Sequence, residues 1–257
     1  MDLNLKELKD FLEEKHDVYN RPRFIETDPV SIPHRYTAKE DIEIAGFLSA
    51  IIAWGQRKTI LRNANFLMEL MNHAPHEFVM NASPVEINKL GTFVHRTFNG
   101  DDCKYFIRAL RNIYMKHGGL EGIFGGDDKV MNPVEKGLVR LRKVFFEIEH
   151  PRGTEKHIAD ITRGASGKRL NMFLRWMVRR DNRGVDFGIW KTVPSSRLFI
   201  PLDIHTGNVS RKLGLLERKQ NDWKAVVELT GKLREMEPDD PVKYDFALFG
   251  LGIFEKF

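Results

Sequence analysis

The sequence has little of what membrane proteins, disulfide-rich proteins and metalloproteins need. Its 257 residues include a single cysteine, Cys103, which excludes an internal disulfide and any iron–sulfur or zinc site built from cysteines alone. The most apolar stretch, 44–54, is interrupted by Gly46 and Ser49 and is far shorter than the ~18 residues of a membrane span. The first residues lack a basic segment followed by an apolar one, as a signal peptide requires. We therefore expect a cytoplasmic protein with no membrane partner, no metal and no cofactor.

Familiar nucleotide-binding and hydrolase motifs are also missing. Gly167-Lys168 resembles the end of a phosphate-binding P-loop, but Thr162 stands where that motif needs glycine and Arg169 where it needs Ser or Thr. Neither G-x-G-x-x-G nor G-x-S-x-G occurs. Alternating apolar and polar patterns typical of strands are scarce, and 197–202 is the best candidate for an extended segment. These absences exclude the common α/β nucleotide-binding enzymes.

Helical periodicity fills most of the chain instead. Ser83-Pro84 and Asn132-Pro133 each combine an N-cap, a proline at the first helical position and a glutamate two residues later, which predicts a helix start. The glycine-rich stretch 118–128 predicts a surface loop. We expect an all-α fold with helices over 39–54, 56–73, 101–117, 154–162, 167–180, 203–213, 221–235 and 240–254, and a further helix from 132.

The expected architecture is two packed helical subdomains. A central subdomain covers 40–200, and a C-terminal helical subdomain covers 201–257. The N-terminal segment 1–39 is expected to pack with the C-terminal subdomain.

Positive charge is concentrated in one part of the chain. The whole sequence carries a net charge of +5, whereas residues 152–219 hold 15 Lys and Arg against 6 Asp and Glu, a net of +9. The other residues are therefore mildly acidic. A local basic field of this kind typically attracts a polyanion such as nucleic acid, although a solvated charged surface is the alternative.

The most informative segment begins inside this basic region. Gly164 and Gly167 predict a tight turn between two helices, and the second helix then starts at Lys168 with its first backbone N–H groups exposed. Such N–H groups on a glycine turn form a natural phosphate site. Further along, Asp203 stands immediately before the predicted helix 203–213, where it would act as the N-cap.

These residues resemble the helix-hairpin-helix superfamily of base-excision DNA glycosylases, which includes endonuclease III. The family's hairpin has the form L-P-G-V-G-R-K-T-A-N-x-x-L. Gly164 matches its first glycine, Ser166 replaces the second, and Lys168 falls on the lysine that bifunctional members use as nucleophile. The family's V-D-T-H segment falls on Asp203 and His205. The resemblance implies a glycosylase-like fold with a helix-hairpin-helix motif.

The sequence also departs from that family. Lys168 and Asp203 are 35 residues apart, wider than the usual spacing, and the intervening insertion is similar to one in an archaeal 8-oxoguanine glycosylase branch. Ile51 stands where many members place a glutamine that fills the gap left by a flipped base, and the cysteines of an iron–sulfur cluster are absent. The whole chain also resembles a bacterial family of uncharacterised proteins.

The resemblance implies a DNA N-glycosylase/AP lyase that excises a damaged base, for example an oxidised one, from duplex DNA. Lys168 would attack C1′ of the deoxyribose, and Asp203 would stabilise positive charge that develops there. A base inside a duplex must be flipped out, and Trp54 or Trp190 could stack on it. The expected phosphate and backbone contacts are Arg163, Gly164, Ser166, Gly167, Arg169 and His205.

Simpler interpretations stay open at this point. Asp203 alone is consistent with a helix cap, and Lys168 alone with a solvated surface lysine. The functional alternatives are a non-catalytic nucleic-acid-binding protein on the same fold and an enzyme that acts on RNA.

Overall fold

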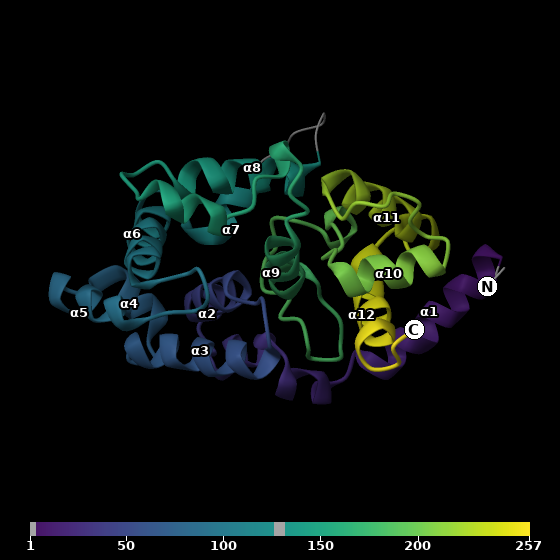
Figure 1. The fold of residues 1–257 in the computed structure, drawn as a ribbon, viewed down its shortest axis with the longest axis horizontal. Helices are drawn as coiled ribbons and strands as arrows, with labels where there is room; N and C mark the ends of the chain where they lie inside the picture. The colour runs from purple at the N-terminus through teal and green to yellow at the C-terminus, as the bar shows by residue number, and fades with distance from the viewer. Residues whose placement is uncertain (1–3, 126–131) are drawn as a thin grey trace. The chain divides into compact units, whose positions relative to one another are not determined.

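The computed structural model describes residues 4–125 and 132–257, and these form α-helices joined by loops and 3₁₀ helices (Figure 1). The described chain contains no β-strand, so the expected all-α class is confirmed. The α-helices are α1 (Leu5–Tyr19), α2 (Lys39–Ile51), α3 (Arg57–Leu70), α4 (Pro75–Asn81), α5 (Pro84–Lys89), α6 (Gly100–Lys116), α7 (Gly119–Phe124), α8 (Pro133–Phe145), α9 (Lys168–Val178), α10 (Ile204–Lys212), α11 (Trp223–Met236) and α12 (Asp245–Ile253).

The chain divides into two compact units. Unit 1 combines residues 1–24 with 160–257, and unit 2 consists of residues 25–159. This division differs from the expected one, because the glycine turn and α9 belong with the C-terminal helices rather than with a central subdomain over 40–200. The first and last segments of the chain therefore share one unit.

Unit 2 is organised around α2, whose residues from Ile42 to Ile51 are all buried. Its core is rich in phenylalanine. The Phe106 ring lies 4.6 Å from that of Phe145 and 5.0 Å from that of Phe98, centroid to centroid, in edge-to-face arrangements. Edge-to-face geometry is preferred because it brings the positive edge of one ring to the negative face of the next.

Unit 1 is organised around α12, which packs against both α1 and α10 (Figure 1). Close approach of α1 requires glycine at position 250, where a Cβ atom would lie 2.2 Å from the Tyr19 ring. Phe246 is fully buried, whereas Phe249 is half-exposed and Val227 of α11 is exposed. Helical periodicity places Phe249 and Val227 on the apolar face of these helices, but neither side chain is fully buried.

Two expected elements differ in the structure. The predicted helix over 154–162 is replaced by two 3₁₀ helices, η5 (Arg152–His157) and η6 (Ile161–Arg163). The glycine-rich stretch predicted as a loop contains the short helix α7, while residues 126–128 of that prediction lie outside the described residues. The segment expected to be extended, 197–202, begins with the last residue of η7 (Ser195–Arg197); Leu198 then has an extended backbone, and no strand forms among the described residues.

Candidate functional site

A tight turn precedes α9, as the two glycines predicted. Gly164 and Gly167 both adopt left-handed backbone conformations, with φ of 88° and 64°, which favour glycine. Gly167 is the N-cap of α9 and provides no side chain to satisfy the helix N-terminus. The element before the turn is the 3₁₀ helix η6, so the expected α-helix on that side of the hairpin is wrong.

The turn is held in place by residues from α11 and α9. The backbone N–H of Trp223 donates to the carbonyl of Gly164 at 3.1 Å, and Ala165 forms a bridge with Asp222. The side-chain amide of Asn171 donates to the carbonyl of Ser166 at 3.2 Å. These contacts fix the position of Lys168, which is the first residue of α9.

The expected phosphate contacts differ in how accessible they are. The side chain of Arg163 is 83% exposed and lies 3.5 Å from Asp160, whereas Gly167 is buried. Gly164 has open space where a side chain would project, which leaves room for a phosphate, and Ser166 is half-exposed. Arg169 is half-buried, and burial lowers its pKa to about 10. Arg163 is thus the most accessible cation of this turn.

Lys168 and Asp203 lie close together, although 35 residues separate them in sequence. The Lys168 Nζ atom is 3.8 Å from Asp203 Oδ2, and about a quarter of each side chain is exposed. Nζ is also 3.8 Å from the sulfur of Met172, one turn further along α9. The two residues that the family resemblance assigned to chemistry therefore face one another within unit 1 and are open to solvent.

The two carboxylate oxygens of Asp203 have different partners. Oδ1 accepts a hydrogen bond from the backbone N–H of Thr206 at 3.0 Å, which makes Asp203 the N-cap of α10 as expected. Oδ2 is the oxygen directed at Lys168. The backbone carbonyl of Asp203 accepts from the Asn221 side chain at 3.0 Å. The carboxylate is thus oriented by the helix start and keeps one oxygen for the lysine. His205, two residues later, is exposed.

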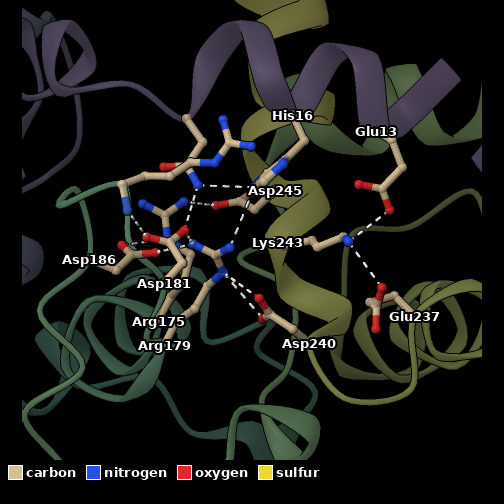
Figure 2. A network of polar contacts seen from close by, with 12 residues as sticks. Glu13, His16, Arg175, Arg179, Asp181, Asp186, Glu237, Asp240, Lys243 and Asp245 are labelled. Atoms are coloured by element: carbon tan, nitrogen blue, oxygen red, sulfur yellow. Dashed lines mark hydrogen bonds and ion pairs between the residues drawn. The ribbon is translucent and has the colours of Figure 1, made fainter. Parts of the chain in front are cut away.

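A buried network of ionised side chains lies in the same unit as this pair (Figure 2). Arg175 of α9 is ion-paired with Asp245 at the start of α12 and lies 3.2 Å from Asp186. Arg179, directly after α9, contacts Asp186 at 3.1 Å and Asp240 at 2.9 Å. These arginines are almost completely buried, so two cations of the basic segment 152–219 neutralise carboxylates inside the protein and do not contribute to the surface field.

Asp245 connects the buried network to the exposed pair. Burial raises the pKa of Asp245 to about 6; the charges of Arg175 and Lys168 oppose this shift, and the charge of Asp203 adds to it. Asp245 is thus close enough to sense the charge of both candidate catalytic residues. Sequence reasoning did not identify it, because no motif links Asp245 to the region around Lys168. The available indication was that Lys168 and Arg175, seven residues apart, share one face of a helix.

The two tryptophans proposed to stack on a base have different environments. Trp190 is 2% exposed and packs edge-on against Phe173 at 5.5 Å, so it is a core residue and not a stacking platform. Trp54 belongs to unit 2 and is half-buried. Its ring lies 4.9 Å from that of His95 and stacks on that of His157 at 6.0 Å. Trp176, on α9, is fully buried.

Neither a metal centre nor a membrane segment is found in the described parts of the chain. Over residues 4–125 and 132–257, no cluster of three His, Cys, Asp or Glu side chains could hold a metal ion. No helix within those residues is long and apolar enough to cross a membrane.

Comparison with known proteins gives one match. A family model described as a protein of unknown function (DUF2400) matches residues 28–254. No curated protein and no solved structure matches the chain.

Proposed function

The chain belongs to the DUF2400 family, whose description names no activity, and we propose from the geometry of unit 1 that it is a DNA N-glycosylase/AP lyase for a damaged base. One observation carries this proposal. A lysine at the start of a helix on a glycine turn lies 3.8 Å from a carboxylate that caps a second helix. Both residues belong to the segments that resemble the helix-hairpin-helix glycosylases. We therefore also propose that the turn and its helices are arranged as in that family.

The proposed reaction uses each of the two side chains at C1′ of the deoxyribose. The neutral amine of Lys168 forms a bond to C1′ as the bond to the base breaks, and the electron pair leaves with the base. Asp203 stabilises the positive charge that develops on the sugar. The nitrogen then loses a proton, the C1′–O4′ bond breaks and O4′ takes up a proton, which leaves an imine. Loss of a proton from C2′ and departure of the 3′ phosphate by β-elimination then break the strand.

The surroundings of the pair support contact with nucleic acid. Lys168 follows directly on a turn where Gly164 leaves open space and Arg163 is exposed. A phosphate could approach the first backbone N–H groups of α9, which have no side-chain cap, together with the guanidinium of Arg163. The sugar attached to that phosphate would then lie near Nζ of Lys168. The base-stacking residue is not assigned, because Trp190 is buried and Trp54 belongs to the other unit.

A second candidate function is non-catalytic binding of damaged or distorted nucleic acid. The observation that favours it is the ion pair itself, because a lysine that pairs with a carboxylate at 3.8 Å acts as a positive charge and not as a nucleophile. Under this alternative, Lys168 would act as a fixed positive charge towards the phosphates.

Borohydride trapping separates the two functions. Protein incubated with duplexes that contain an abasic site or a panel of oxidised bases is reduced with borohydride, and covalent adducts are resolved by denaturing electrophoresis. We expect an adduct with wild-type protein and none with Lys168→Gln, which keeps most of the side chain but has no nucleophile. Lys219→Gln is the matched control, since Lys219 is exposed and lies in the same unit.

Asp203→Asn tests the other half of the mechanism. It should abolish base excision but leave some trapping at a preformed abasic site, because attack there does not require the base to leave. Tight binding without trapping on any duplex would favour the non-catalytic function. Excision on RNA but not on DNA would identify an RNA-acting enzyme.

A further inference from the structure

Unit 2 contains an open groove of about 560 Å³ that the proposed activity does not use. It is bordered by α5, by the first half of α6 and by η5, and α5 packs against α6 (Figure 1). All of its lining residues belong to unit 2, so its shape is defined within that unit. The volume is within the range of small-molecule sites in proteins.

The walls of the groove combine apolar and amide groups. Pro84 and Ile87 of α5 and Pro151 before η5 line the groove and give apolar surfaces suited to a flat ring. Asn88 also lines the groove and is exposed, and its side-chain amide has no hydrogen-bond partner among the described residues. An amide of this kind can both donate and accept at the edge of a ring.

The charges of the groove leave two cations for a ligand. Lys104 pairs with Asp101 at 3.4 Å. Arg108 and Lys156 are exposed, and within residues 4–125 and 132–257 neither has a carboxylate partner. The guanidinium of Arg108 lies 5.7 Å above the Tyr105 ring, which keeps it oriented without neutralising its charge.

The buried acid in the lining is already satisfied. Asp102 accepts hydrogen bonds from Thr154 Oγ1 at 2.7 Å, from the backbone N–H of Asn99 at 3.0 Å and from His157 Nε2 at 3.1 Å. These bonds connect η5 to the start of α6 and make this part of the groove rigid. They stabilise the Asp102 carboxylate without removing its charge, and the groove is net positive because its lining has three cations, Lys104, Arg108 and Lys156, against the two carboxylates of Asp101 and Asp102.

We propose that this groove binds a nucleotide, either free or as part of a single strand. Arg108 and Lys156 hold its phosphate, and the base lies against the proline and isoleucine walls with its edge at Asn88. The groove is formed by residues of unit 2 alone, whereas Lys168 and Asp203 belong to unit 1, so it does not depend on the glycosylase proposal.

Gly153 offers a way to block the groove without touching its charges. It lines the groove, and no protein atom lies within 4 Å of the position where its Cβ would be. Its φ is also outside the left-handed region, so a side chain is tolerated by the backbone. Gly153→Phe should therefore fold and place a ring in the groove. Gly231→Phe on α11 is the matched control, because Gly231 has the same open surroundings in unit 1.

Titration calorimetry with a nucleoside 5′-monophosphate is the first measurement. We expect wild-type protein to bind with a Kd on the order of 0.1–1 mM, because the groove is open and only two cations are free. Gly153→Phe should weaken binding at least about tenfold, and so should the double variant Arg108→Glu/Lys156→Glu. The charge control is Lys58→Glu/Lys143→Glu, two exposed lysines of the same unit, which should bind like wild type.

A short single-stranded oligonucleotide and inorganic phosphate complete the test. If wild-type protein binds the monophosphate and the groove variants do not, the result supports a site for a free nucleotide. Binding of the oligonucleotide alone, weakened by the same variants, supports a nucleotide within a strand. The proposal is overturned if neither ligand responds to Gly153→Phe and the charge reversal, or if inorganic phosphate binds as well as the monophosphate.

Discussion

Asp203, which faces Lys168, combines a structural role with the proposed catalytic one. Asp203 caps α10 with one oxygen and faces Lys168 with the other, so the same carboxylate can serve local structure and chemistry. Asp245 adds a third ionisable group, held by Arg175 behind the pair. The charges of Lys168 and Asp203 act on the pKa of Asp245, so the titration of Asp245 should appear in the dependence of stability on pH.

Asp245→Asn should change how stability varies with pH. The pKa of Asp245 is raised from 3.8 to about 6 in the folded protein, so the folded state holds this proton more tightly than the unfolded state. Its contribution to stability is fully present below about pH 4 and is lost as the pH rises through about 6. The difference in unfolding free energy, wild type minus variant, should therefore fall between these pH values.

Urea unfolding at several pH values between 4 and 7 measures this difference. Other titrating groups change the unfolding free energy of both proteins in the same way, so their contributions largely cancel in this difference. A difference that is constant over this range would show that Asp245 does not titrate there.

At the scale of elements, α12 is the centre of unit 1. Phe246 is fully buried on this helix, with the guanidinium of Arg175 4.2 Å above its ring and the Phe24 ring 5.3 Å away. The same ring thus packs in the core and covers the buried arginine. Phe249, one turn further along, is half-exposed.

Phe246→Ala should lower the free energy of unfolding by about 3–5 kcal/mol, because it removes a buried ring and leaves a cavity beside Arg175. Phe249→Ala is the control and should cost clearly less. Chemical denaturation of the two variants at one pH gives the comparison. Equal losses of unfolding free energy would mean that the two rings contribute alike to stability and that their different burial on α12 does not determine it.

For the whole molecule, the basic segment 152–219 is less positive at the surface than its sequence implies. Arg175 and Arg179 are buried against carboxylates, whereas Arg163 is exposed beside the glycine turn. Binding to nucleic acid should therefore depend on a limited number of cations around that turn.

Binding to duplex DNA should weaken as salt increases, with weak preference for sequence. Each phosphate neutralised adds about −0.9 to the slope of log K against log salt concentration, so Arg163→Glu should make the slope shallower by about that amount. Lys232→Glu on α11 is the control, since Lys232 pairs with Glu235 and lies away from the turn in sequence. Fluorescence anisotropy at several salt concentrations measures the slope. Wild-type binding that does not change between low and moderate salt would contradict an electrostatic contact.

Local sequence determined the helical class, the glycine turn and the cap at Asp203. These features depend on residues a few positions apart: periodic apolar side chains, glycines that adopt positive φ, and a carboxylate three residues before the N–H that it accepts. The 3₁₀ helices η5 and η6 were missed because apolar spacing alone does not distinguish them from an α-helix. In the structure the Asp102 carboxylate holds η5 through Thr154 and His157.

Only the tertiary structure decided which distant side chains meet. The burial of Trp190, the pairing of Arg175 with Asp245 and the groove beside Arg108 join segments far apart in the chain, and no local pattern encodes such contacts. The 3.8 Å approach of Lys168 to Asp203 is of the same kind. A family resemblance anticipated it, but the approach itself depends on tertiary contacts: α10 packs against α12, and Arg175 of α9 is ion-paired with Asp245 of α12.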